Sequence, residues 1–70
     1  MSDEYEDWQQ RLIDEYNDLS VKLIKLTRFI ESPKFDSVGD GERQDLRRQR
    51  EAMIQYMVVL GSRSTRFLKV

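Results

Sequence analysis

RQDLRRQREAMIQYMVVLGSRSTRF, residues 43–67, is the stretch that decides the fold, because it holds a long apolar row and most of the chain's arginines. Its apolar side chains recur at steps of three, four or seven: Leu46, Met53, Met57, Leu60 and Phe67. These steps place them on one side of a helix with about 3.6 residues per turn. A second row lies beside the first: Ile54, Val58, Thr65 and Leu68. The two rows together are wider than one partner helix covers, so two partners are expected.

The stretch that precedes this helix predicts another one of similar length. Its apolar residues follow one another at steps of three and four: Tyr5, Trp8, Leu12, Tyr16, Leu19, Leu23, Leu26 and Ile30. The average step is about 3.6, which is typical of the seam between two packed antiparallel helices. Four further apolar residues lie off this row: Ile13, Val21, Ile24 and Phe29. They indicate a second, intermolecular contact.

Pro33 ends the first helix, because proline cannot donate to the helix ladder and disfavours helical angles in the residue before it. The segment KFDSVGDG, residues 34–41, has turn-forming residues, and we expect Phe35 and Val38 to fold back over the open end. Two long helices joined so briefly must run antiparallel. The prediction is therefore one all-α domain over residues 1–70, an antiparallel two-helix hairpin completed by homo-oligomerisation. Helix one is expected at about 3–31, the loop at 32–41 and helix two at about 42–67.

The composition narrows the function. The chain has 70 residues, no cysteine, no histidine and a net charge of -1. Disulfides, thiol chemistry and the usual zinc sites are excluded, so no metal and no cofactor is expected. The usual catalytic base and nucleophile are missing, and no phosphate-binding glycine loop occurs, so no catalytic residue and no enzymatic activity are expected. No apolar run is long enough for a bilayer, which favours a soluble, cytoplasmic protein, and duplex nucleic acid is disfavoured by the net negative charge.

The charges are distributed unevenly along the chain. Residues 1–33 carry eight acidic and four basic side chains, whereas residues 34–70 carry five acidic and eight basic ones. Antiparallel pairing would bring an acidic start beside a basic end: Asp3, Glu4, Glu6 and Asp7 beside Arg63, Arg66 and Lys69. Other basic residues should gather near the loop: Lys25, Arg28, Lys34, Arg43, Arg47, Arg48 and Arg50. They form either a solvated face of mixed charge or, through some of the arginines, a clamp for phosphate.

Residues 61–65, Gly-Ser-Arg-Ser-Thr, are small or hydroxylated where a strong helix former would be expected. One interpretation is close packing against Trp8 or Tyr5. The other is a polar recess in which hydroxyls and Arg63 or Arg66 hold a ligand while an aromatic ring, with Tyr56 the freest candidate, stacks on it. The candidate ligand-binding residues are Arg47, Arg48, Arg50, Tyr56, Ser62, Arg63, Thr65 and Arg66.

The chain also resembles a group of known proteins. The segment KLTRFIESPKF, a Ser-Val turn and the pattern ERQDLRRQREAMxQYxxVLxxR, within residues 12–66, resemble small helical hairpins encoded by tailed phages and prophages. Those are similar in turn to phage anti-defence sponges, which sequester the cyclic oligonucleotide or ADP-ribose-derived signals of CBASS and Thoeris systems. The resemblance implies a homo-oligomer, a dimer or a higher form such as a hexamer, in the cytoplasm of an infected bacterium. It also implies a ligand between protomers, stacked on aromatic rings and clamped by Arg, Lys and hydroxyl groups.

Two functional hypotheses follow. In the first, the protein captures a cyclic nucleotide-type immune signal without converting it. In the second, a charged and apolar helix face binds and blocks a host defence protein, such as a nuclease or a CRISPR effector. A purely structural role in the phage is a third option.

Overall fold

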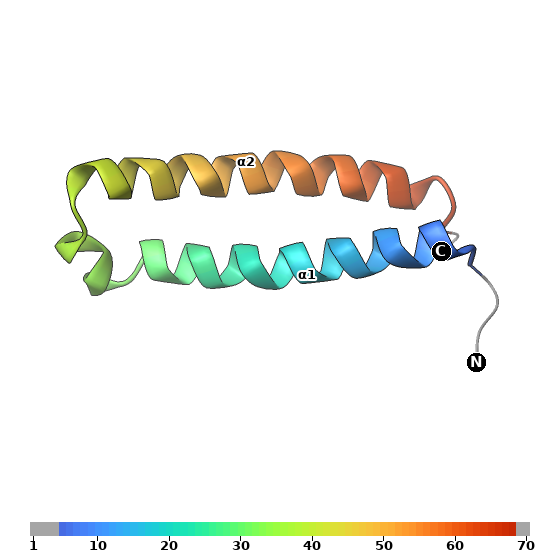
Figure 1. The fold of residues 1–70 in the computed structure, drawn as a ribbon, viewed down its shortest axis with the longest axis horizontal. Coiled ribbons are helices and arrows are strands. Elements are labelled where there is room, and N and C mark those ends of the chain that lie inside the picture. The colour runs from blue at the N-terminus through green and yellow to red at the C-terminus, as the bar shows by residue number, and fades with distance from the viewer. Residues whose placement is uncertain (1–4, 69–70) are drawn as a thin grey trace.

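The computed structural model describes residues 5–68 and contains two long helices packed side by side in opposite directions (Figure 1). Helix α1 covers Asp7–Ile30, a 3-10 helix, η1, covers Pro33–Ser37, and α2 covers Asp40–Thr65. The part of the chain that is described has no strand. The all-α antiparallel hairpin predicted from the sequence is therefore confirmed, in a rod of 48 × 22 × 20 Å.

Helix α1 begins later than the sequence suggested. Tyr5 lies in a bend, Glu6 is the extended N-cap residue, and the helix starts at Asp7 rather than near residue 3. The side chain of Gln9 accepts a hydrogen bond of 2.8 Å from the backbone N–H of Glu6. The Glu6 side chain in turn accepts a hydrogen bond from the backbone N–H of Gln9. This reciprocal capping fixes the residue at which α1 starts. Residues 3 and 4, where helix one was expected to begin, lie outside the described residues.

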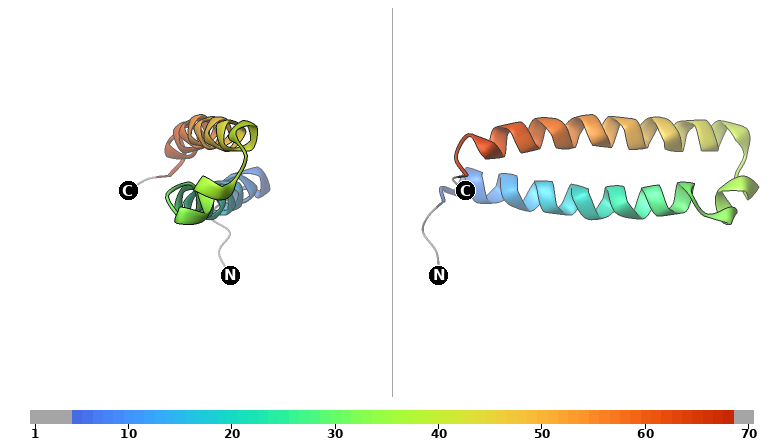
Figure 2. Two further views of the ribbon diagram at one scale, coloured as in Figure 1. Left: turned by 90° about the vertical axis from the view of Figure 1, so that its left-hand side faces the viewer. Right: turned by 180° about the vertical axis from the view of Figure 1, so that it is seen from behind.

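The connection between the helices is partly helical itself (Figure 2). Helix α1 ends before Pro33 as predicted, and the Ser32 hydroxyl donates a 2.7 Å hydrogen bond to the Phe29 carbonyl. Phe35 is only 3% exposed, and its ring lies edge-on to the Phe29 ring with 6.1 Å between the centroids. Phe35 thus covers the open end of the hairpin as expected, with Val38 half-buried.

Helix α2 starts at Asp40, two residues before the expected position, and ends at Thr65 rather than Phe67. Gly39 is its extended N-cap residue. The Arg43 side chain pairs with the Asp40 carboxylate and donates a 3.2 Å hydrogen bond to the Asp36 carbonyl. Arg43 therefore ties the first turn of α2 to η1, which explains why the helix starts early.

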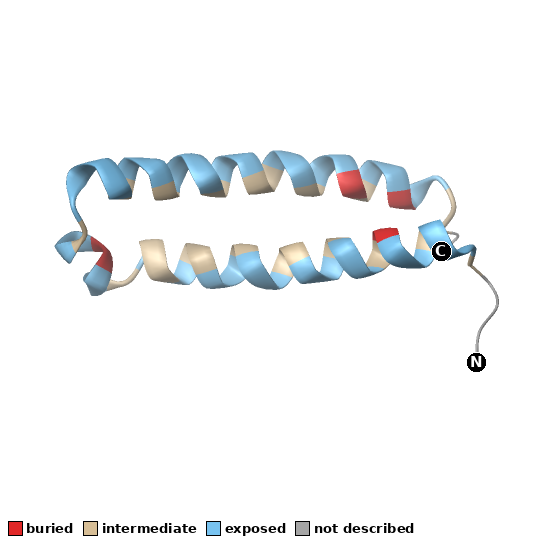
Figure 3. Cartoon of the chain, in the orientation of Figure 1, coloured by how far each residue is buried: buried red, intermediate tan, exposed pale blue. Residues whose placement is uncertain are grey.

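The core is thin. Among residues 5–68, only Leu12, Phe35 and Leu60 are buried apolar residues, at 2%, 3% and 0% exposed, and the facing sides of the helices are otherwise mostly half-buried (Figure 3). Trp8 was predicted to lie on the packed seam, but it is 50% exposed and contacts the edge of Phe67 at the end of the hairpin, with 5.6 Å between ring centroids. The end of a two-helix structure has no further layer to cover so large a ring. Neither described helix is long and apolar enough to cross a membrane.

Arg50 occupies the packed row of α2 between Leu46 and Met53. Its side chain is half-buried, and its Nε atom has no hydrogen-bond partner among the described residues. A buried N–H group without a partner costs about 1–3 kcal/mol. Arg50 is therefore a weak point of the packing.

Ion pairs do not hold the two helices together in the described part of the chain. The pairs within residues 5–68, Arg43 with Asp40 and Arg48 with Asp45, both lie inside α2. The acidic start of α1 and the basic end of α2 share one end of the hairpin, where Trp8 meets Phe67, but Glu6 and Asp7 form no ion pair with Arg63 or Arg66. Of the residues named for this contact, Asp3, Glu4 and Lys69 lie outside the described range.

Candidate functional site

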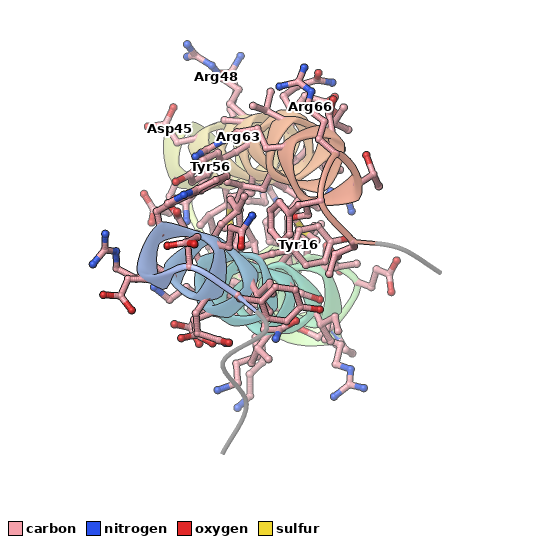
Figure 4. The ribbon with its side chains drawn as sticks, turned by 90° about the vertical axis from the view of Figure 1, so that its right-hand side faces the viewer. Tyr16, Asp45, Arg48, Tyr56, Arg63 and Arg66 are labelled. Carbon is pink, nitrogen blue, oxygen red and sulfur yellow. The ribbon has the colours of Figure 1, made fainter. Side chains whose placement is uncertain are left out.

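The eight candidate residues all lie on or just after α2, but they do not converge. Figure 4 shows Arg48 and Arg66 pointing away from α1, whereas Tyr56 and Arg63 lie on one flank of the hairpin. Arg47 and Arg66 are 19 residues apart, which is about 28 Å along a helix. One hairpin therefore does not bring all eight into a single site, because they occupy different sides of one long helix.

Two of the arginines that were candidates for a phosphate clamp have other surroundings. The Arg47 guanidinium lies over the Phe35 ring, with Cζ 5.0 Å from the centroid, in a cation–π contact. The Arg48 side chain is 78% exposed and lies 3.8 Å from the Asp45 carboxylate. Arg47 therefore packs on Phe35, which covers the open end of the hairpin. Arg48 belongs to the solvated outer face.

Tyr56 borders a surface groove between the helices, with a volume of about 400 Å³. We call it the charged groove. Its lining residues are Arg11, Asp14, Glu15, Asp18, Leu19, Lys22 and Tyr56. Tyr56 is 45% exposed, so part of its ring is accessible to a ligand. Arg63 follows Tyr56 by seven residues, about two helical turns, and lies on the same flank (Figure 4).

The charged groove has groups suited to different parts of a nucleotide. An accessible aromatic ring stacks with bases of any kind. Arg11 and Lys22 form no ion pair within residues 5–68, so their N–H groups are available to phosphate oxygens. The three carboxylates repel phosphate but accept hydrogen bonds from ribose hydroxyls or base amino groups. The volume lies within the usual range of small-molecule sites, about 300–1,000 Å³.

Arg11 and Lys22 were not among the sequence-based candidates. Four of the α1 residues that line the groove follow one another at steps of four, three and four: Arg11, Glu15, Asp18 and Lys22. This spacing alone would have placed them on one face of a helix. Their proximity to Tyr56 depends on the register between the two helices, which the sequence did not specify.

A second depression, of about 330 Å³, lies at the glycine and hydroxyl-rich part of α2. We call it the uncharged recess. It is lined by Ile13, Tyr16, Asn17, Gly61, Ser64, Thr65 and Leu68. A Cβ atom on Gly61 would lie 3.6 Å from Cε2 of Tyr16. The aromatic neighbour of Gly61 is thus Tyr16, not Trp8 or Tyr5 as expected.

The uncharged recess is poorly suited to phosphate. The Ser64 hydroxyl donates to the Leu60 carbonyl at 2.8 Å, and the Thr65 hydroxyl donates to the Ser62 carbonyl at 3.0 Å. Both hydroxyl protons are therefore used within α2, and none of the described residues that line the recess is a cation. A polar recess was expected near this segment, but Arg63 lies away from it, because its position in the helical repeat faces the other flank (Figure 4).

The described residues also contain no group of three or more His, Cys, Asp and Glu side chains placed to hold a metal ion. The groups of the charged groove that can contact a ligand include its aromatic ring, its two cations and its three carboxylates.

The fold defines the molecule as a small all-α helical hairpin. Residues 6–66 match the model of the Sequestin family, which covers most of the chain. The chain belongs to the Sequestin family. The family name is consistent with a protein that sequesters a signal molecule. Comparisons with curated proteins and with solved structures gave no match.

Proposed function

We propose that this protein binds a cyclic nucleotide-type immune signal and sequesters it without converting it. Membership of the Sequestin family over residues 6–66 supports capture of a small signal. The observation that assigns the proposal to a particular surface is the charged groove, whose lining includes the half-exposed Tyr56 ring together with Arg11 and Lys22. We further propose that the protein acts in the cytoplasm of a phage-infected bacterium, against a CBASS or Thoeris system.

In this proposal the base of the signal stacks on Tyr56, which contributes about 1–3 kcal/mol. Arg11 and Lys22 hold phosphate oxygens at the α1 side, and Arg63 reaches the same flank from α2. Each charge-assisted hydrogen bond contributes about 1.5–3 kcal/mol. Asp14 and neighbouring carboxylates accept hydrogen bonds from hydroxyl or amino groups, which favours a nucleotide over an inorganic anion.

The mechanism is stoichiometric capture. A ligand that is only held leaves the free pool in proportion to the amount of protein and its dissociation constant. The groove requires no bond to be broken in the ligand. Binding energy, rather than transition-state stabilisation, is therefore the quantity that the groove residues determine.

The test is the thermal stability of the purified protein with a panel of cyclic di- and trinucleotides and cyclic ADP-ribose isomers. A ligand at about 100 times its dissociation constant adds about 2.7 kcal/mol. In a domain of this size each kcal/mol raises the melting temperature by about 4–8 °C. We expect a large upward shift with one class of ligand. No shift with any member up to millimolar concentration would refute capture and favour the alternative, inhibition of a host defence protein.

Three variants test whether the site is the charged groove. Tyr56→Ala should weaken binding by about 5–150-fold, which corresponds to 1–3 kcal/mol. Tyr56→Phe keeps the ring and should bind within a few-fold of the original protein. Arg48→Ala removes a cation that is 78% exposed on the outer face, and it should leave affinity unchanged. Equal losses in Tyr56→Ala and Arg48→Ala would contradict the assignment to the groove.

A further inference from the structure

A second heptad-like row runs along each helix, beside the row that joins them. On α2 and just beyond it the row has steps of four, three, four and three: Ile54, Val58, Gly61, Thr65 and Leu68. On α1 the corresponding row has the same steps: Ile13, Asn17, Ser20, Ile24 and Thr27. Neither row contains a charged residue. Such spacing is typical of a helix face that packs against further helices.

The two rows lie on the same flank of the hairpin. The uncharged recess brings Ile13 and Asn17 together with Gly61, Thr65 and Leu68. Farther along the same rows, Ile24 is 48% exposed and Val58 is 60% exposed. We call this surface the uncharged flank. It is depleted of charge in the way that the core of a protein–protein interface is.

The hairpin would gain stability by packing against a further layer of helices. Only three apolar residues of the described chain are buried, and the sequence has no cysteine for a disulfide. Chains of this size rarely obtain more than about 3–5 kcal/mol from one core and use disulfides, metals or oligomerisation for support. The described residues also lack a cluster suited to a metal ion. Association is the remaining way to bury the second row.

We propose that the uncharged flank packs against the same flank of a second copy of this chain, forming a four-helix bundle. The hairpin extends 48 × 22 × 20 Å along its principal axes, so one of its long sides has room for the roughly 800 Å² per partner that a stable interface buries. Two copies related by a two-fold axis present identical rows to each other. The small residues Ser20 and Gly61 allow close approach of the backbones, and a partner side chain fills the recess of about 330 Å³.

A second copy suits this surface better than a charged partner. The heptad spacing needs a partner with the same repeat, and the hairpin itself carries that repeat on two helices. The opposite flank is different, because Tyr56 is surrounded there by charged residues of α1. Charges at the rim of an interface are tolerated, whereas unpaired charges in its core are costly. The two flanks therefore have separate roles, and the dimer leaves both charged grooves accessible.

Val58 and Val59 provide a matched pair for the test. They are neighbours in α2 and similarly exposed, at 60% and 54%, but only Val58 belongs to the second row. The molar mass of the purified protein should be at least twice the chain mass of 8.4 kDa, measured by light scattering after size exclusion. Val58→Asp should reduce the mass to that of one chain, and Val59→Asp should not. A wild-type mass of one chain at about 100 μM, or equal effects of the two substitutions, would overturn the proposal.

Loss of folding is distinguished from loss of association by circular dichroism on the same samples. If Val58→Asp abolishes the helical signal, the less disruptive substitutions Val58→Ser and Val59→Ser are used in place of the two aspartate variants. The dissociation constant of the dimer is then measured by sedimentation. We expect at least a tenfold weaker dimer for Val58→Ser only. An unchanged dissociation constant would overturn the proposal. None of these measurements uses a ligand, so their outcome does not depend on the proposed function.

Discussion

Replacing Arg50 with methionine should stabilise the protein, although it removes a charged residue from the helix. Arg50 lies in the packed row between Leu46 and Met53, and its buried Nε has no partner among the described residues. Methionine retains an unbranched, flexible stem of similar reach and has a helix propensity close to that of arginine. The substitution therefore removes an unsatisfied donor while keeping most of the packing.

The expected gain follows from the cost of that donor. A buried, unsatisfied N–H group costs about 1–3 kcal/mol, and the lower end applies because the Arg50 side chain is only half-buried. We expect about 1 kcal/mol of added stability, or a melting temperature higher by about 4–8 °C. Urea unfolding followed by circular dichroism measures the free energy, with both proteins at the same concentration because association contributes to stability.

Arg48→Met is the matched control, since it makes the same chemical change two residues away at a side chain that is 78% exposed. Its stability should stay within about 0.5 kcal/mol of the original. A loss of more than 1 kcal/mol in Arg50→Met would refute the reasoning, because it would mean that the guanidinium is satisfied. Arg50 lies in the packed row away from the groove lining, so Arg50→Met should also leave ligand affinity nearly unchanged.

Further predictions concern packing and the connection. Leu60→Ala should lower the free energy of unfolding by about 2–5 kcal/mol because Leu60 is 0% exposed, whereas Leu60→Met should lower it by less than about 1.5 kcal/mol. Equal unfolding midpoints of the two variants in urea would contradict this. Arg47→Ala should cost about 0.5–1 kcal/mol through loss of its contact with Phe35, and similar stability of Arg47→Ala and wild type in the same assay would show that the contact contributes nothing. Gly41→Ala should raise the melting temperature slightly, because no atom lies within 4 Å of the added Cβ, and a lower melting temperature would mean that the first turn of α2 needs glycine.

The helical periodicity of the sequence was enough to predict the hairpin, because a row at steps of three and four fixes both the type of element and its buried side. Pro33 fixed the end of the first helix, and the aromatic Phe35 was correctly expected to cover the open end. The predicted start of α1, at about residue 3, was wrong by four residues. Several acidic residues in succession could each serve as the cap, and only the Glu6 and Gln9 contact selects one.

The arrangement of the candidate site was harder to predict. Periodicity places each residue on a face of its own helix, but it does not specify how far one helix slides along the other. Tyr56 lines one groove with Arg11 and Lys22, and Gly61 lies next to Tyr16, only in the register that the packed row adopts. The sequence-based set grouped arginines by their closeness in the chain, although Arg47 and Arg48 point to different surroundings one residue apart.

The measurement that tests capture without conversion most directly is an isothermal titration with the ligand that gives the largest thermal shift, followed by denaturation of the complex and analysis of the released ligand. A groove on each hairpin predicts one ligand per chain, released chemically intact. A ligand held between two chains would instead give one ligand per two chains and would contradict the location. Release of a cleaved product would contradict sequestration itself.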